Sequence, residues 1–169
     1  MSARPVPASA NVHVLRQGAD LLSRIDDTTF RHAIGAQLRH TLDFYGSFLR
    51  GLPGRRIDYD TRERDPLVES SRRIARERFG AIIAALERIT PEQSALPVEV
   101  RTEADTLDPS EPEWTSSSVR RELLFLLSHT VHHNALVKEL LRARGCALDD
   151  DFGVAPSTLG HRARLACAR

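Results

Sequence analysis

The chain has 169 residues, of which 41% are hydrophobic and 28% are charged, a composition typical of one globular domain. Its 24 Lys and Arg residues nearly balance its 23 Asp and Glu residues, and the formal charge of +1 argues against nucleic-acid or membrane-surface partners. No stretch approaches the roughly 20 apolar residues of a membrane-spanning helix, and no apolar signal segment opens the chain. Cys146 and Cys167 are too few for a disulfide framework. We therefore expect a cytoplasmic, soluble protein.

The first half of the chain predicts two amphipathic helices. The spacing of apolar residues predicts helices over residues 12–25 and 30–52. The turn Asp26–Thr29 between them offers side chains that can cap a helix N-terminus, and Pro53 is expected to end the second helix. Because the connection is short, we expect these two helices to be antiparallel neighbours.

The middle of the chain predicts a third helix and a small β element. Asp65 followed by Pro66 is typical of a helix start, and we expect a helix from residue 66 to about residue 89. Residues 96–102 alternate as a strand does, and residues 113–115 are the candidate partner strand. A short hairpin is the first interpretation, and an exposed loop is the alternative.

The last third predicts the longest helix. Ser116–Ser118 offer capping hydroxyls before an amphipathic segment over residues 119–144, and Gly145 is the expected residue just beyond its end. A short final helix is expected after Cys146. Two long connections, before residue 66 and before residue 119, are long enough to cross a helical bundle.

These patterns together predict an all-α fold, namely a four-helix bundle with a small β-hairpin or loop insertion before the last long helix. Residues 1–11, which carry prolines and little apolar surface, are expected to be a flexible tail. Residues 12–169 are expected to form a single domain.

Three of the seven histidines lie where they could meet. His129 and His133 stand four residues apart on the apolar face of the 119–144 helix, and His40 flanks the apolar face of the 30–52 helix. Three imidazoles from two helices form a ligand set that leaves a coordination position open, which is typical of a catalytic metal site. Glu122, two turns before His129 on the same face, is a candidate outer-shell hydrogen-bond acceptor or base.

A structural role for these histidines is the alternative. Chance alone gives about 0.3 histidine pairs at this spacing in such a composition, and the glutamate of the HExxH zinc peptidase motif is absent. Metal binding is favoured because two neutral imidazoles in an apolar stripe each need a partner, and one cation would satisfy both.

Four stretches resemble a known family: IGAQLRHTLDFYGSFLRGL, IDYDTRERD, SSVRRELLFLLSHTVHHNALVKELLRARG and FGVAPSTL. They are similar to the DinB-like family, also called YfiT-like metalloenzymes, whose motifs are one histidine on the second helix and a His-x-x-x-His on the last long helix. The resemblance implies an up-down-down-up four-helix bundle that holds zinc, nickel or a similar divalent metal ion on His40, His129 and His133. Some relatives carry a further histidine in a HxxDHY-like run, and Phe44 stands at that position here.

The resemblance also suggests an activity. Relatives include thiol-S-transferases that act with a low-molecular-weight thiol such as bacillithiol or mycothiol, so it implies such a transferase, or a hydrolase using metal-bound water, with a small-molecule substrate. Glu122 and Tyr45 are the candidate catalytic proton-transfer groups, although Tyr45 also suits a core position with its hydroxyl at the rim. The residues that would bind the thiol are unknown. A non-catalytic metal-binding or stress-induced small-molecule-binding protein is the alternative, and relatives suggest a homodimer.

Overall fold

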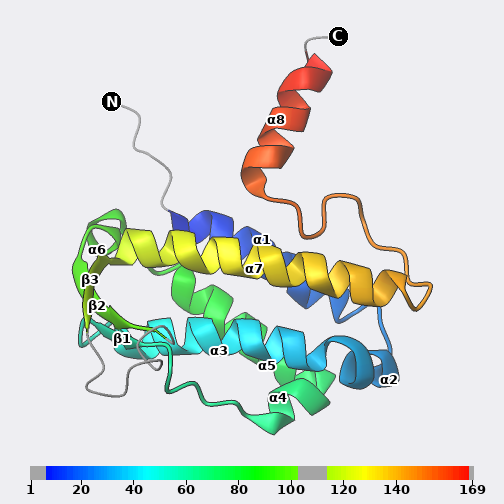
Figure 1. Cartoon of the computed structure of the whole chain (residues 1–169), viewed down its shortest axis with the longest axis horizontal. Coiled ribbons are helices and arrows are strands. Elements are labelled where there is room, and N and C mark those ends of the chain that lie inside the picture. The colour runs from blue at the N-terminus through cyan, green and yellow to red at the C-terminus, as the bar shows by residue number, and fades with distance from the viewer. Residues whose placement is uncertain (1–6, 103–113, 168–169) are drawn as a thin grey trace.

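The computed structural model describes residues 7–102 and 114–167, which are mostly helical with a small three-stranded sheet at one end (Figure 1). Its helical segments are α1 (Pro7–Leu21), α2 (Asp27–Thr29), the π-helical η1 (Phe30–Ile34), α3 (Gly35–Gly51), α4 (Pro66–Ser70), α5 (Arg72–Leu86), α6 (Pro91–Ser94), α7 (Val119–Arg142) and α8 (Pro156–Cys167). Its strands are β1 (Arg56–Asp58), β2 (Pro97–Arg101) and β3 (Thr115–Ser118). Within the described residues, every helix is too short or too polar to cross a membrane.

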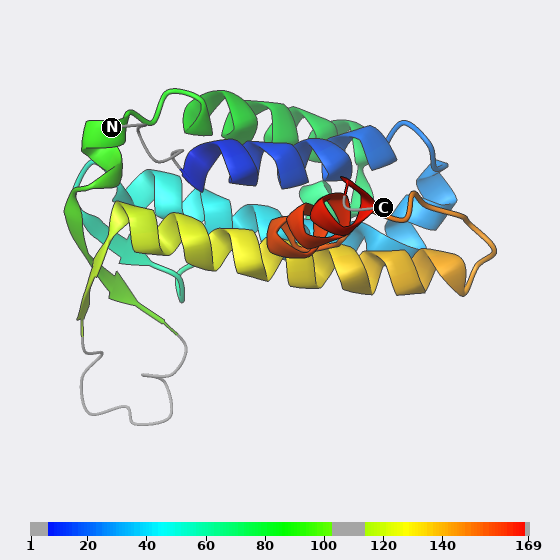
Figure 2. The ribbon, with the colours of Figure 1, turned by 90° about the horizontal axis from the view of Figure 1, so that it is seen from above.

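The long helices α1, α3, α5 and α7 enclose the main hydrophobic core. α1 and α7 run in one direction, and α3 and α5 run in the other (Figures 1 and 2). α1 packs against α5 and α7, and α3 packs against the same two helices, so α1 and α3 lie on a diagonal. The expectation that the first two long helices are neighbours is therefore wrong. The reason is that α2 and η1 lie between α1 and α3 in the chain, so α3 begins diagonally opposite α1 and not beside it.

Two predicted helices are interrupted. The segment expected as one helix over residues 30–52 begins as the π-helical η1, and Gly35 then lies so close to α4 that an added Cβ would be 2.0 Å from the Glu69 carbonyl oxygen. The segment expected as one helix over residues 66–89 is broken at Ser71, which is extended and whose hydroxyl accepts from Ile74 N to cap α5. A serine hydroxyl competes in this way with the helical hydrogen bonds.

The sheet confirms the expected antiparallel pair and adds a strand. β2 pairs antiparallel with β3, with Val98 opposite Ser117, and β3 begins at Thr115 where the return strand was expected at 113–115. β1, which was not expected, pairs parallel with β2 and buries Ile57 completely. Most of the connection between these two strands falls on residues 103–113, outside the described residues.

The predicted caps of α7 are confirmed. Ser118 accepts from the backbone N–H of Arg121, and Gly145 takes a positive φ of 76° just beyond the helix. The Cys146 N–H then donates to the Leu141 carbonyl, which is the hydrogen bond of a Schellman ending. The expected final helix is α8, which projects from the other helices (Figure 1). The expected tail falls partly on residues 1–6, outside the described residues, while residues 7–11 belong to α1.

Candidate metal centre

Three histidine side chains from two helices converge at one point. His40 comes from α3, and His129 and His133 come from successive turns of α7, which packs against α3. Their ligand nitrogens all lie within 4.8 Å of one another. The Nε2 atoms of His40 and His129 are 3.2 Å apart. The structure thus brings together the three histidines that the sequence singled out.

The spacing of these nitrogens fits a metal ion. A tetrahedral zinc site with Zn–N bonds of about 2.0–2.1 Å places its ligand nitrogens roughly 3.3–3.4 Å apart. The observed 3.2 Å between the Nε2 atoms of His40 and His129 is close to that value. An all-imidazole ligand set suits zinc, nickel, copper or iron rather than calcium or magnesium, which prefer oxygen ligands.

The imidazoles of His129 and His133 are neutral at physiological pH. Burial, followed by the nearby histidines, lowers the pKa of His129 to about 3. The same causes lower the pKa of His133 to about 4. A neutral imidazole keeps one nitrogen lone pair, which a metal ion needs. The Nδ1 atom of His129 is buried and has no hydrogen-bond partner within the described residues.

A glutamine orients one of the three rings. His133 Nδ1 donates to Gln37 Oε1 at 2.7 Å, so the lone pair of that ring is on Nε2. Such an outer hydrogen bond fixes the orientation of a ligating histidine. Sequence reasoning missed Gln37, although its position three residues before His40 on α3 puts both side chains on the same helix face.

An aromatic wall borders the histidines. The Phe44 ring lies 4.2 Å from the His129 ring, centroid to centroid, and the Phe125 ring lies 5.8 Å from it. Tyr59 stacks on Phe44 with 5.4 Å between centroids. The guanidinium carbon of Arg62 lies 4.6 Å from the Phe44 centroid, which adds a positive charge beside the wall. The guanidinium carbon of Arg121 lies 5.8 Å from the Phe125 centroid, so this edge of the cluster is apolar, with the two cations Arg62 and Arg121 beside it.

Glu122 lies in a buried hydrogen-bonding position at the start of α7. Its carboxylate accepts from the Tyr59 hydroxyl at 3.0 Å, from Ser117 Oγ at 2.5 Å and from Arg121 Nη1 at 3.0 Å. These bonds tie β3 and the residue after β1 to α7. A catalytic role for Glu122 stays a prediction.

Tyr45 lies in the core between three helices. Its hydroxyl donates to Asn11 Oδ1 at 2.6 Å and is 2.9 Å from Thr130 Oγ1. Burial raises the pKa of Tyr45, so the phenol keeps its proton at neutral pH. The hydroxyl is fully buried, whereas the sequence allowed a position at the rim. A catalytic role for Tyr45 also stays a prediction.

The fold and the histidines define a mainly helical protein with a site that could hold a metal ion. The sequence matches the DinB superfamily over residues 6–137, and the chain belongs to that superfamily. It is also similar to "FK506-binding protein 5" of Rhizopus delemar, with 31% identity over 105 residues. That match covers 62% of this chain and 27% of the relative, so the chain spans about a quarter of its length. No solved structure matches the chain.

Proposed function

We propose that this DinB-superfamily protein is a divalent-metal-dependent enzyme in which His40, His129 and His133 hold zinc or nickel. The four long helices are, in this proposal, the up-down-down-up bundle of the family. The observation that carries the proposal is the convergence of the three ligand nitrogens within 4.8 Å. Glu122 and Tyr45 remain candidate proton-transfer groups within it.

The surroundings of the histidines favour transfer to a low-molecular-weight thiol. An ion held there would supply Lewis-acid activation of a thiol nucleophile. The rings of Phe44 and Phe125 would contact the apolar part of an electrophile and exclude water from that side. Arg62 would pair with an anionic group, because small biological thiols commonly carry a carboxylate. Gln37 would hold the ring of His133 in place.

An assay with a thiol and a fluorogenic electrophile tests the proposal. The protein, purified without an affinity tag and loaded with zinc or nickel, is mixed with bacillithiol or L-cysteine and monochlorobimane. The thiol sulfur displaces chloride from carbon, so a C–S bond forms, a C–Cl bond breaks and the thiol proton goes to solvent. We expect a rate above the uncatalysed reaction that disappears in His40→Ala and persists in His32→Ala, an exposed histidine outside the cluster.

The other outcomes separate the alternatives. Hydrolysis of p-nitrophenyl acetate without thiol, in the absence of bimane transfer, would assign a hydrolase instead. Stoichiometric metal without either activity would leave a non-catalytic metal-binding protein. Failure to retain zinc or nickel would overturn the proposal altogether. Homodimerisation stays a separate prediction, which sedimentation equilibrium would test.

A further inference from the structure

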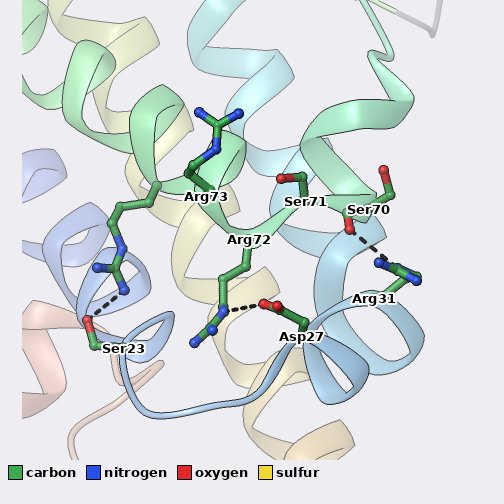
Figure 3. A pocket seen from close by; sticks show the side chains of 8 residues that line it. Ser23, Asp27, Arg31, Ser70, Ser71, Arg72 and Arg73 are labelled. Atoms are coloured by element: carbon green, nitrogen blue, oxygen red, sulfur yellow. Dashed lines mark hydrogen bonds and ion pairs between the residues drawn. The ribbon is translucent and has the colours of Figure 1, made fainter.

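A polar cavity separate from the histidine cluster lies where the loop after α1 meets the start of α5, and Figure 3 shows it from close by. Its volume is about 520 Å³, within the range of small-molecule sites. The residues that line it are Ser23, Asp27, Arg31, Ser70, Ser71, Arg72, Arg73 and Arg76. They place four guanidinium groups and three serines around the cavity against one carboxylate, and the three histidines of the metal centre do not line it.

Two of these arginines have no ion pair within residues 7–102 and 114–167. Arg31 uses Nε to donate to the Ser70 carbonyl at 3.3 Å, and Arg76 uses Nη2 to donate to Ser23 Oγ at 2.9 Å. Each guanidinium carries five N–H donors, so most donors of both groups remain for another acceptor. In Figure 3, Arg31 and Ser23 lie on opposite sides of Arg72. The unpaired charges therefore flank the cavity from both sides.

The remaining two arginines are already engaged. Arg72 donates through Nε to Asp27 at 2.6 Å and through Nη1 to the carbonyl groups of Leu22 and Ile25, so it connects the loop after α1 and the first residue of α2 to the start of α5. Arg73 pairs with Glu77. These contacts fix the cavity wall and leave Arg31 and Arg76 as the groups that can hold an anion.

We propose that this cavity binds a small phosphate-bearing molecule through Arg31 and Arg76. A phosphate group offers several oxygens to several donors at once, and guanidinium groups match its geometry. The hydroxyl groups of the lining serines supply further donors. The cavity also borders the first turn of α5, where the helix dipole favours negative charge. A volume of about 520 Å³ admits a body larger than the phosphate itself. This site is independent of the proposed metal-dependent activity.

Calorimetric titration with sodium pyrophosphate, inorganic phosphate and citrate tests this site. We expect saturable binding at one site per chain, tighter for pyrophosphate than for phosphate, and weakened by added salt. In the double variant Arg31→Gln/Arg76→Gln, the pyrophosphate affinity should fall by about tenfold or more, because two charged hydrogen-bonding groups are lost. If the double variant fails to fold, the single variant Arg31→Gln, which removes one exposed side chain, tests the site by the same measurement of pyrophosphate affinity.

Two controls make the result specific. Arg88→Gln/Arg164→Gln removes the same charge from exposed arginines outside the cavity and should leave the affinity within about twofold. His129→Ala should bind pyrophosphate as the unmodified protein does, which separates this site from the metal centre. Each of four results would overturn the proposal: absence of saturable binding, an equal loss of pyrophosphate affinity in both double variants, tighter binding of citrate than of pyrophosphate, or a loss of pyrophosphate affinity in His129→Ala.

Discussion

Two polar clusters lie side by side between α3 and α7, and they differ in how fully their atoms are hydrogen-bonded. One is the core network around Tyr45, which includes Thr130 on α7. The other is the histidine cluster, which includes the adjacent residue His129. Both clusters consist of polar residues on helix faces that otherwise bury apolar side chains.

In the Tyr45 network, the protein supplies a partner for each polar group. The Tyr45 hydroxyl donates to Asn11 Oδ1, and Asn11 Nδ2 donates to the Leu123 carbonyl at 2.8 Å. Thr130 Oγ1 donates to the Leu126 carbonyl at 2.7 Å. A buried network satisfied in this way stabilises one packing of the helices and has no capacity left for a ligand.

In the histidine cluster, the protein supplies fewer partners. Gln37 accepts from His133, but Nδ1 of His129 has no partner within the described residues. The facing Nε2 atoms of His40 and His129 share one contact at 3.2 Å. The difference teaches that burial of polar side chains does not itself mark a site, whereas the convergence of three imidazole nitrogens within 4.8 Å does.

The largest effect expected from this comparison is the loss of metal in His129→Ala. Removal of one of three ligands should reduce bound zinc to below roughly 0.1 ion per chain after dialysis, whereas the unmodified protein retains about one. Elemental analysis measures the ion, and circular dichroism verifies that the helices remain. His132→Ala, an exposed residue of the same helix, should retain the ion. Full occupancy in His129→Ala would show that the cluster does not bind metal as a unit.

An intermediate effect is expected for Gln37→Leu, which removes the acceptor for His133 Nδ1 while keeping a similar volume. Loss of such an outer hydrogen bond typically weakens metal binding by about 10–100-fold. Competition with a chromophoric chelator measures the change. Gln37→Glu keeps an acceptor for the same N–H and should bind the ion at least as tightly as the unmodified protein. Equal weakening in both variants would mean that Gln37 acts through packing instead.

Much of the fold follows from local rules, which is why its helices and caps were predictable. Asp65 accepts from Leu67 N and Ser118 accepts from Arg121 N, as residues at those positions before helices usually do. The break at Ser71 and the short strand β1 were not predictable in this way. Strand β1 depends on a partner far along the chain, because Ile57 forms a strand only where β2 offers it an edge. The break at Ser71 has a local cause, the cap that its hydroxyl gives to Ile74 N, but the apolar pattern continues through residue 71 and does not show it.

The residues of the candidate site also differ in whether a local sequence pattern could predict them. His40, His129 and His133 could be selected because a 3.6-residue repeat places each on or beside an apolar helix face. Gln37 and Asn11 were not selected, because a polar residue on a helix, even one on the same face as His40, does not reveal its partner until the facing helix is known. Gln37 meets His133 across 96 residues of sequence, and Asn11 meets Tyr45 across 34. The sequence patterns do not show which residues of two packed helices face each other.

The smallest effect on metal binding is expected for Tyr45→Phe. This substitution leaves Asn11 Oδ1 and Thr130 Oγ1 each without one buried partner, which should lower the free energy of unfolding by about 1–3 kcal/mol in urea denaturation. Zinc affinity should change by less than about twofold, because the phenol belongs to the saturated network.

Combining Tyr45→Phe with Gln37→Leu shows whether the two clusters are independent. If they are, the losses in metal affinity add to within about 0.5 kcal/mol in a double-mutant cycle. A larger coupling energy would mean that the Tyr45 network sets the position of α7 on which His129 depends. The Tyr45 hydroxyl would then be a positioning group for the metal centre. The extent of hydrogen bonding within a cluster would no longer distinguish a structural cluster from a binding site.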